Sequence, residues 1–177
     1  MRLTGQQAIP APQERVWAGL NDPEVLKLCI PGCESIRKTT DTAFEAKVTV
    51  KVGPVKARFT GEVSLVNLDP PESYTITGHG QGGIAGFAKG KADVRLDKVD
   101  AGETLLHYDV DAQIGGRLAM LGSRLVDGTA RSLAQKFFDK FVELMSRPAP
   151  AIPPVKVARA PAKKTARKKP AKKTARR

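Results

Sequence analysis

Two histidines are the residues of this sequence best suited to acid–base chemistry, because imidazole titrates near neutral pH. His79 lies in the segment TITGHGQ, and His107 lies in LLHYDVDA. Along both segments, each histidine falls on the side of the alternating pattern that carries the charged neighbours, opposite the apolar side. We therefore predict that both side chains face solvent. With no inward-facing His, Asp or Glu, general acid–base catalysis has no evident residue to perform it, and we expect no catalytic site.

A glycine-rich segment, Gly78 to Gly83, satisfies the GxGxxG pattern of dinucleotide-binding proteins. In those proteins the pattern follows a strand and begins a helix that binds the pyrophosphate. Here the segment from Ile84 to Leu96 is typical of a loop and a second strand. This context argues against a dinucleotide site. We interpret the glycines as a turn that leaves room beside a ligand or a long helix.

Metal-ligating residue types are present but poorly arranged. Cys29 and Cys33 flank Pro31-Gly32, and a structural zinc site would need two more ligands. We expect buried, reduced thiols rather than a disulfide. Asp109 and Asp111 share the solvated side of a predicted strand, and Asp127 is distant in sequence. We predict no metal site and no intrinsic cofactor.

The charge is concentrated at the C-terminus. The 177 residues carry a net charge of +12, but the segment 149–177 holds eleven Lys or Arg and no Asp or Glu, which leaves 19 basic and 18 acidic residues before it. We predict one domain over 1–147 and a disordered Lys/Ala/Pro-rich tail over 148–177. The sequence contains no run of eighteen apolar residues and no recognisable export signal, so a cytoplasmic location is expected.

The tail contains a near repeat, PAKKTARKK followed by PAKKTARR. Its cations could bind an anionic membrane surface or nucleic acid, or could simply aid solubility. No aromatic residues are interleaved with them, which argues against base stacking. The residues predicted to bind a polyanion are Lys163, Lys164, Arg167, Lys168, Lys169, Lys172, Lys173, Arg176 and Arg177.

The rest of the chain predicts an α+β domain. After a first strand, Val16, Trp17 and Leu20 share one helical face, and a second short helix begins near Pro23 and stops at Pro31-Gly32. Clean alternation of apolar and charged residues then predicts an antiparallel sheet of about six or seven strands with one dry face. A long C-terminal helix, from near Arg117 to Arg147, is expected to cover that face.

The predicted dry face is rich in small side chains, where a tightly filled core would use Leu, Ile or Phe: Ala46, Ala57, Gly61, Gly78, Gly80, Gly90, Ala92 and Ala112. We expect an apolar pocket of a few hundred Å³ between helix and sheet, with Tyr74 and Tyr108 as its only polar groups. The alternatives are that the helix packs closer to the sheet, or that the glycines allow the sheet to bend.

Long stretches of the sequence resemble one known family. They are IPAPQERVWAGLNDPEVLKLCIPGCESI, VTVKVGPVKARFTGEVSL, DPPESYTITGHGQGGIAGFAKGKADVRL and YDVDAQIGGRLAMLGSRLVDG. Together they resemble the CoxG family, that of the G subunit of carbon monoxide dehydrogenase, over about Gln7 to Met145. The resemblance implies the helix-grip fold of the START-like, or polyketide-cyclase-like (SRPBCC), superfamily, in which an antiparallel sheet wraps around a long C-terminal helix.

The resemblance also implies a function, that of a non-catalytic accessory protein of molybdenum hydroxylases, which recruits them to the cytoplasmic membrane and handles respiratory quinone. Here the basic tail would provide the membrane attachment. An alternative from the wider superfamily is an enzyme acting on an apolar substrate. The residues expected to contact the ligand are Phe59, Tyr74, Phe87, Tyr108, Met120, Leu121 and Leu125. Those expected to border the cavity entrance are Gly80, Gly82, Gly83 and Gly86.

Overall fold

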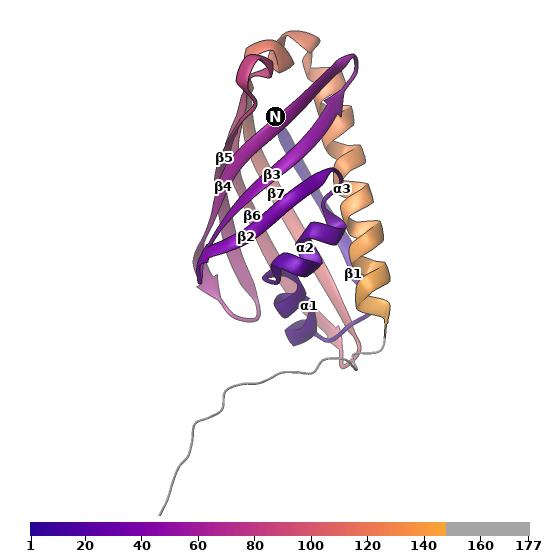
Figure 1. Ribbon diagram of the computed structural model, residues 1–177. Coiled ribbons are helices and arrows are strands. Elements are labelled where there is room, and N and C mark those ends of the chain that lie inside the picture. The colour runs from indigo at the N-terminus through magenta and orange to yellow at the C-terminus, as the bar shows by residue number, and fades with distance from the viewer. Residues whose placement is uncertain (148–177) are drawn as a thin grey trace, which may run out of the picture. The chain divides into compact units, whose positions relative to one another are not determined.

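The computed structural model describes residues 1–147. Seven antiparallel strands form one sheet in the order β1-β7-β6-β5-β4-β3-β2, which curves around one side of the long helix α3 (Figure 1). The elements are β1 (Arg2–Ile9), α1 (Gln13–Leu20), α2 (Pro23–Cys29), β2 (Cys33–Thr40), β3 (Ala43–Val52), β4 (Val55–Asp69), β5 (Ser73–Gln81), the 3₁₀ helix η1 (Gly83–Ala85), β6 (Phe87–Asp100), β7 (Glu103–Gly115), the 3₁₀ helix η2 (Gly116–Leu121) and α3 (Ser123–Ser146). The predicted α+β helix-grip architecture is confirmed.

The strand register follows from the alternation in the sequence. In the β3–β4 hairpin, Val52 pairs with Val55 across a turn at Gly53, whose φ of 56° suits glycine. Farther along the hairpin, Val48 pairs with Phe59. Because side chains alternate between faces with a period of two, this register places the apolar residues of both strands on the inner face. The inner and outer sets predicted from the sequence are therefore correct.

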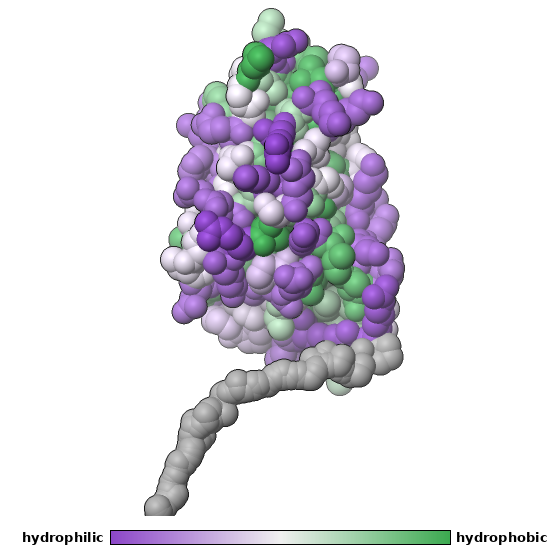
Figure 2. Space-filling view, viewed as in Figure 1, coloured by the Kyte–Doolittle hydropathy of each residue, from purple (hydrophilic) through white to green (hydrophobic). Residues whose placement is uncertain are grey.

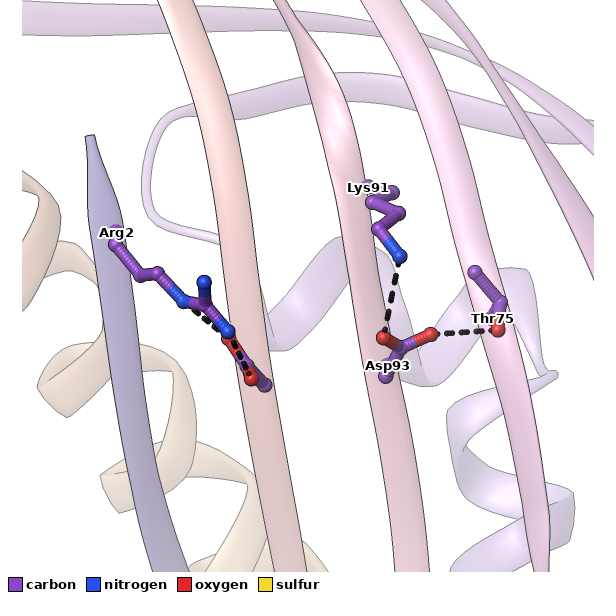
Figure 3. Close-up of polar contacts among 5 residues, drawn as sticks. Arg2, Thr75, Lys91 and Asp93 are labelled. Carbon is purple, nitrogen blue, oxygen red and sulfur yellow. Dashed lines mark hydrogen bonds and ion pairs between the residues drawn. The ribbon is translucent and has the colours of Figure 1, made fainter.

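The outer face of the sheet is polar and solvated. Arg2 on β1 forms an ion pair of 2.8 Å with Asp109 on β7. On the neighbouring strands, Lys91 lies 3.5 Å from a carboxylate oxygen of Asp93, which accepts a hydrogen bond from Thr75 (Figure 3). The hydrogen bond from Arg2 lowers the pKa of the Asp109 carboxyl. The charged side chains of these pairs are exposed, so they keep the face soluble and add little to stability.

The two short helices between β1 and β2 begin as the sequence predicts. The side chain of Asp22 accepts a hydrogen bond from the backbone N–H of Glu24 at 2.9 Å, which caps α2, and Pro23 occupies its first turn. In α1, Val16 and Leu20 are buried, so this helix closes one end of the core. Trp17 packs beside them against the same core.

The long helix is shorter than predicted. The sequence predicts a helix from near Arg117, but residues 116–121 form the separate 3₁₀ helix η2, and α3 begins only at Ser123. The break occurs at Gly122, whose φ of 95° lies outside any right-handed helix. The 24 residues of α3 span about 36 Å, still long enough to cross the sheet.

The buried side chains form two clusters. The larger one, here called the main core, joins α1, α2 and α3 to the sheet, and includes Ile9, Leu96, Leu106 and Phe141, each no more than 2% exposed. The smaller one, here called the tip cluster, consists of Val52, Ala57, Ala85 and Leu118 with partly buried neighbours. It joins the β3–β4 turn to η1 and η2 at the other end of the sheet. The stretch of inner face between the two clusters carries the small residues.

Candidate ligand-binding cavity

A cavity of about 340 Å³ lies between α3 and the inner face of the sheet; we call it the aromatic cavity. Its walls come from α1, α2, α3 and every strand, so residues far apart in sequence converge on it. Apart from two tyrosines, all its lining residues are apolar: Leu3, Leu20, Leu26, Ile30, Ile36, Phe44, Val63, Leu65, Ile76, Ala92, Val94, Leu106, Val110, Ala134, Phe137 and Phe138. A charged ligand would find no partner there, so the cavity suits a neutral, lipophilic molecule.

Tyr74 on β5 lines the aromatic cavity and is only 4% exposed. Its ring meets Trp17 of α1 edge to face, with ring centroids 5.1 Å apart and an interplanar angle of 85°. Burial raises the pKa of the Tyr74 phenol well above its usual range, because the phenolate would be desolvated. The hydroxyl therefore stays protonated at neutral pH and can donate a hydrogen bond.

Tyr108 on β7 supplies the second polar group of the aromatic cavity. The tight fit around it involves Gly5 on the adjacent strand β1, with which Tyr108 is paired in register. A Cβ atom at Gly5 would overlap the Tyr108 hydroxyl. The absence of a side chain at Gly5 is therefore what lets the Tyr108 ring lie where it does.

A second hollow of about 350 Å³ continues along the inner face toward the tip cluster; we call it the small-residue cavity. It shares Val63, Ile76, Ala92 and Val110 with the aromatic cavity, so the two are neighbouring parts of one surface. Most of the small residues noted in the sequence line it: Ala46, Gly61, Gly78, Gly80, Gly90, Ala92 and Ala112. No described residue of α3 lines it. The space predicted from the small side chains exists, and the helix does not fill it.

The seven residues expected to contact a ligand separate into two groups. Tyr74 and Tyr108 line the aromatic cavity, and Phe59 lines the small-residue cavity. The remaining four lie at the end of the domain that holds the tip cluster: the Phe87 ring covers Gly115, Leu121 packs against the tip cluster, Leu125 contacts the β3–β4 turn at Gly53, and Met120 is 84% exposed.

The placement of Met120 corrects the expectation that it contacts the ligand. The sequence predicts one helix from near Arg117 through this segment. Because the helix is interrupted at Gly122, Met120 belongs to a 3₁₀ turn with a different period, and its side chain points to solvent.

The glycines expected at the entrance also lie between the small-residue cavity and the tip. Gly80 lines that cavity, and Gly82 lies against the Phe59 ring. Gly86, with φ of 118°, approaches the backbone so closely that a Cβ would overlap the carbonyl oxygen of Gly115. Gly83 has φ of 61° and open space around it.

Sequence reasoning missed the walls contributed by the helices. Phe137 and Phe138 of α3 and Leu26 and Ile30 near α2 line the aromatic cavity, but were not named as ligand contacts. A signal was available: Phe137-Phe138 is an adjacent aromatic pair in a helix, and such a pair cannot bury both rings on one narrow stripe. The Phe137 and Phe138 rings meet edge to face with their centroids 5.2 Å apart, and the Phe138 ring stacks on Tyr108 of the sheet.

Both histidines lie on the outer face, and His79 is exposed as predicted. His107 is only partly exposed: its Nε2 is buried, 2.9 Å from a carboxylate oxygen of Asp97, an ion-pair distance without the geometry of a hydrogen bond. Cys29 is buried and Cys33 half-buried, and both thiols are free. Burial raises the pKa of Cys29 to about 11.

Within residues 1–147, no three His, Cys, Asp or Glu side chains are grouped closely enough to hold a metal ion. In the same described part of the chain, no helix is both long and apolar enough to cross a bilayer. The nine predicted polyanion-binding residues, Lys163 to Arg177, lie outside the described residues.

Solved structures share this fold. A conserved protein from Geobacillus kaustophilus superposes with a TM-score of 0.77 at 27% identity, covering 82% of this chain and 95% of that one. An aromatase/cyclase from Streptomyces sp. R1128 gives 0.61 at 16% identity (83% and 94% covered), and a START superfamily protein from Mycobacterium smegmatis gives 0.57 at 16% (81% and 98%). No curated protein is similar enough to count as a match.

The sheet gripping α3, the inner cavities and these likenesses define the START-like, helix-grip fold. The family is also clear, because residues 5–146 match the model of the CoxG family, the G subunit of carbon monoxide dehydrogenase. The chain belongs to this family, as its sequence predicts. Family and fold together are those of a ligand-binding accessory protein.

Proposed function

We propose that this protein binds a respiratory quinone in its inner cavities and serves as a non-catalytic accessory protein of a molybdenum hydroxylase of the carbon monoxide dehydrogenase type. In this proposal it recruits the enzyme to the cytoplasmic face of the membrane, and the basic tail contributes to attachment. The observation that supports it best is the aromatic cavity, which is apolar except for two tyrosine hydroxyls.

A quinone matches this cavity in polarity. Its ring and isoprenoid chain are apolar, and its two carbonyl oxygens accept hydrogen bonds. Tyr74 and Tyr108 are the only side chains of the aromatic cavity with a hydroxyl to donate. Volumes of about 340 and 350 Å³ lie within the range of small-molecule sites, roughly 300–1,000 Å³, so the ring and the first isoprene units fit while a longer chain would extend out.

Trp17, the single tryptophan, provides the experiment because it packs against Tyr74 at the cavity wall. Titration of the full-length protein with a short-chain quinone should quench Trp17 fluorescence in a saturable way. The variant Ala134→Leu adds bulk to the wall and should weaken binding at least about fivefold, since accommodating the quinone beside the larger side chain costs about 1–3 kcal/mol. Ala18→Leu makes the same change on the exposed side of α1 and serves as the control.

Equal affinity of the two variants, or no saturable quenching in the parent protein, would contradict the quinone proposal. The partner is tested separately by asking whether the full-length chain, purified from its own cells, brings down a molybdenum hydroxylase. If the chain binds quinone but does not co-purify with such an enzyme, the ligand proposal would hold and the partner proposal would be wrong.

A further inference from the structure

We propose that the end of the domain formed by η1, η2 and the β3–β4 turn docks into the surface of an anionic lipid bilayer, with Ile84 and Met120 inserted among the lipids. This inference rests on the proposed function, because a protein that binds a lipophilic ligand must collect it from a membrane. We call this end, residues 50–57, 80–90 and 113–126, the tip. The last described helix, α3, ends at Ser146, at the opposite end of the domain (Figure 1).

The two most exposed large hydrophobic side chains of the described residues are both at the tip. Met120 is 84% exposed and Ile84 is 80% exposed, and Leu125 in the first turns of α3 is 38% exposed. Met120 and Ile84 each project from a short 3₁₀ turn rather than from a helix or strand that could bury them. Figure 2 shows hydrophobic residues at this end of the surface, next to hydrophilic ones. Exposed apolar groups gathered at one place mark an interaction site.

The backbone holds the two turns firmly together. Gly86 and Gly116 lie in direct contact, so neither position has space for a Cβ atom. Beneath them, the tip cluster packs Ala85 of η1 against Leu118 of η2, with Val52 of the β3–β4 turn. Ile84 and Met120 therefore project outward from two turns that pack on each other, while Ala85 and Leu118 of the same turns point inward.

The charge of the tip identifies the surface it complements. Its three segments contain five cations and no Asp or Glu, and all five are exposed: Lys51, Lys56, Lys89, Arg117 and Arg124. Acidic residues outnumber basic ones in the remainder of residues 1–147, so the positive charge is local to the tip. Apolar side chains surrounded by cations match a bilayer interface with anionic headgroups, where the apolar groups enter the acyl region and the cations meet phosphate.

A groove beside the tip adds a place for a headgroup. It measures about 560 Å³ and runs between α3 and the β3–β4 hairpin. Lys51, Arg124 and Lys136 line it, together with the hydroxyl-bearing residues Thr129 and Ser132. Ammonium, guanidinium and hydroxyl groups are the usual side-chain partners of phosphate. The groove thus extends the same charge complementarity along the side of the helix.

Depth of insertion is the decisive measurement, because the basic tail is itself proposed to bind anionic membranes and would add to the affinity. Ile84→Trp in the full-length protein should be quenched by brominated lipids in vesicles of phosphatidylglycerol and phosphatidylcholine. Val99→Trp is the matched control, since Val99 is 54% exposed at the opposite end of the sheet. Trp17 contributes the same background to both proteins.

Affinity provides the second measurement. The double variant Ile84→Ser/Met120→Ser should sediment with these vesicles at least about tenfold more weakly than the parent, because the apolar contribution is lost. Leu28→Ser/Val99→Ser removes two exposed hydrophobic side chains elsewhere and should change binding by less than about twofold. Arg117→Gln/Arg124→Gln should also weaken binding, whereas Lys27→Gln/Lys98→Gln should not.

Equal quenching at positions 84 and 99, or equal vesicle affinity of the tip and control variants, would overturn the proposal. So would a tip variant that binds vesicles normally but no longer binds a partner protein, since the tip would then be a protein interface. Quinone titration of the same variants in solution separates the two proposals. Normal quinone binding with no lipid insertion would refute only the docking of the tip.

Discussion

The ring of Tyr108 on β7 stacks on the ring of Phe138 on α3, with centroids 5.3 Å apart and planes inclined by 21°. This contact joins the middle of the sheet to the middle of the helix and forms one wall of the aromatic cavity. Phe137 stacks in turn on Phe141, which is fully buried. The position of the tyrosine hydroxyl in the cavity is thereby fixed by the packing of α3.

Gly5→Ala should disturb this wall without altering any cavity residue. A Cβ at position 5 would overlap the Tyr108 hydroxyl, so the ring must move away from its place on Phe138. We expect quinone affinity to fall several-fold and stability to fall by about 1–3 kcal/mol. Fluorescence titration and chemical denaturation measure the two effects. Gly102→Ala, where only a carboxylate oxygen at 3.8 Å lies nearby, is the control; if both behave alike, Tyr108 does not depend on Gly5.

Removal of the cavity hydroxyls should weaken quinone binding selectively. Tyr74→Phe and Tyr108→Phe keep the rings and delete one donor each, and a net hydrogen bond contributes about 0.5–1.5 kcal/mol, or roughly twofold to tenfold in affinity. A hydrocarbon analogue that lacks the carbonyl oxygens should bind the parent and both variants equally. A uniform loss for both ligands would indicate altered packing instead.

Two glycines of the tip should respond very differently to alanine. Gly86→Ala combines φ of 118° with overlap of the Gly115 carbonyl oxygen, and we expect it to cost about 3 kcal/mol. Gly83→Ala, with φ of 61° and no atom nearby, should cost only about 1–2 kcal/mol. Denaturant midpoints of the two variants test this ranking, and the reverse order would show that the turns are not packed as described.

Alkylation of Cys29 should be slow at pH 8 and become fast only in strongly alkaline solution. Burial raises the pKa of this thiol to about 11, from 9.0 in an unstructured chain. The folded state therefore binds the proton more tightly. The contribution of the protonated Cys29 thiol to the stability of the folded state is fully present below pH 9 and is lost as the pH rises through 11. Iodoacetamide kinetics on Cys33→Ser report Cys29 alone; fast reaction at pH 8 would mean that the thiol is accessible.

Much of the fold could be predicted because each strand obeys one simple rule. The alternation around Val48 and Phe59 identified the inner face of the β3–β4 hairpin, and the same rule placed Tyr74 and Tyr108 inside and His79 outside. These are local properties of the sequence. The folded sheet keeps this pattern because a shift of one residue in strand register would expose all the apolar side chains of that strand.

The remainder depended on contacts between distant segments. The apolar spacing of Leu118, Leu121 and Leu125 suits a helix, and nothing in that spacing shows that Gly122 adopts a positive φ. Met120, expected to contact the ligand, lies instead on the separate 3₁₀ helix η2 and is 84% exposed. The helical spacing does indicate that Phe137 and Phe141 face the sheet, but it does not show how close α3 lies to each strand, and this distance decides which of its residues line the cavity.

The division of the core into two clusters gives the domain unequal resistance to local opening. Thirteen buried residues form the main core, whereas four form the tip cluster. Amide hydrogens of η1, η2 and the β3–β4 turn should therefore exchange through small openings, long before those of β6 and β7 beside the main core, which need global unfolding. The end of the molecule that borders the small-residue cavity is thus the part that can unfold locally while the rest stays folded.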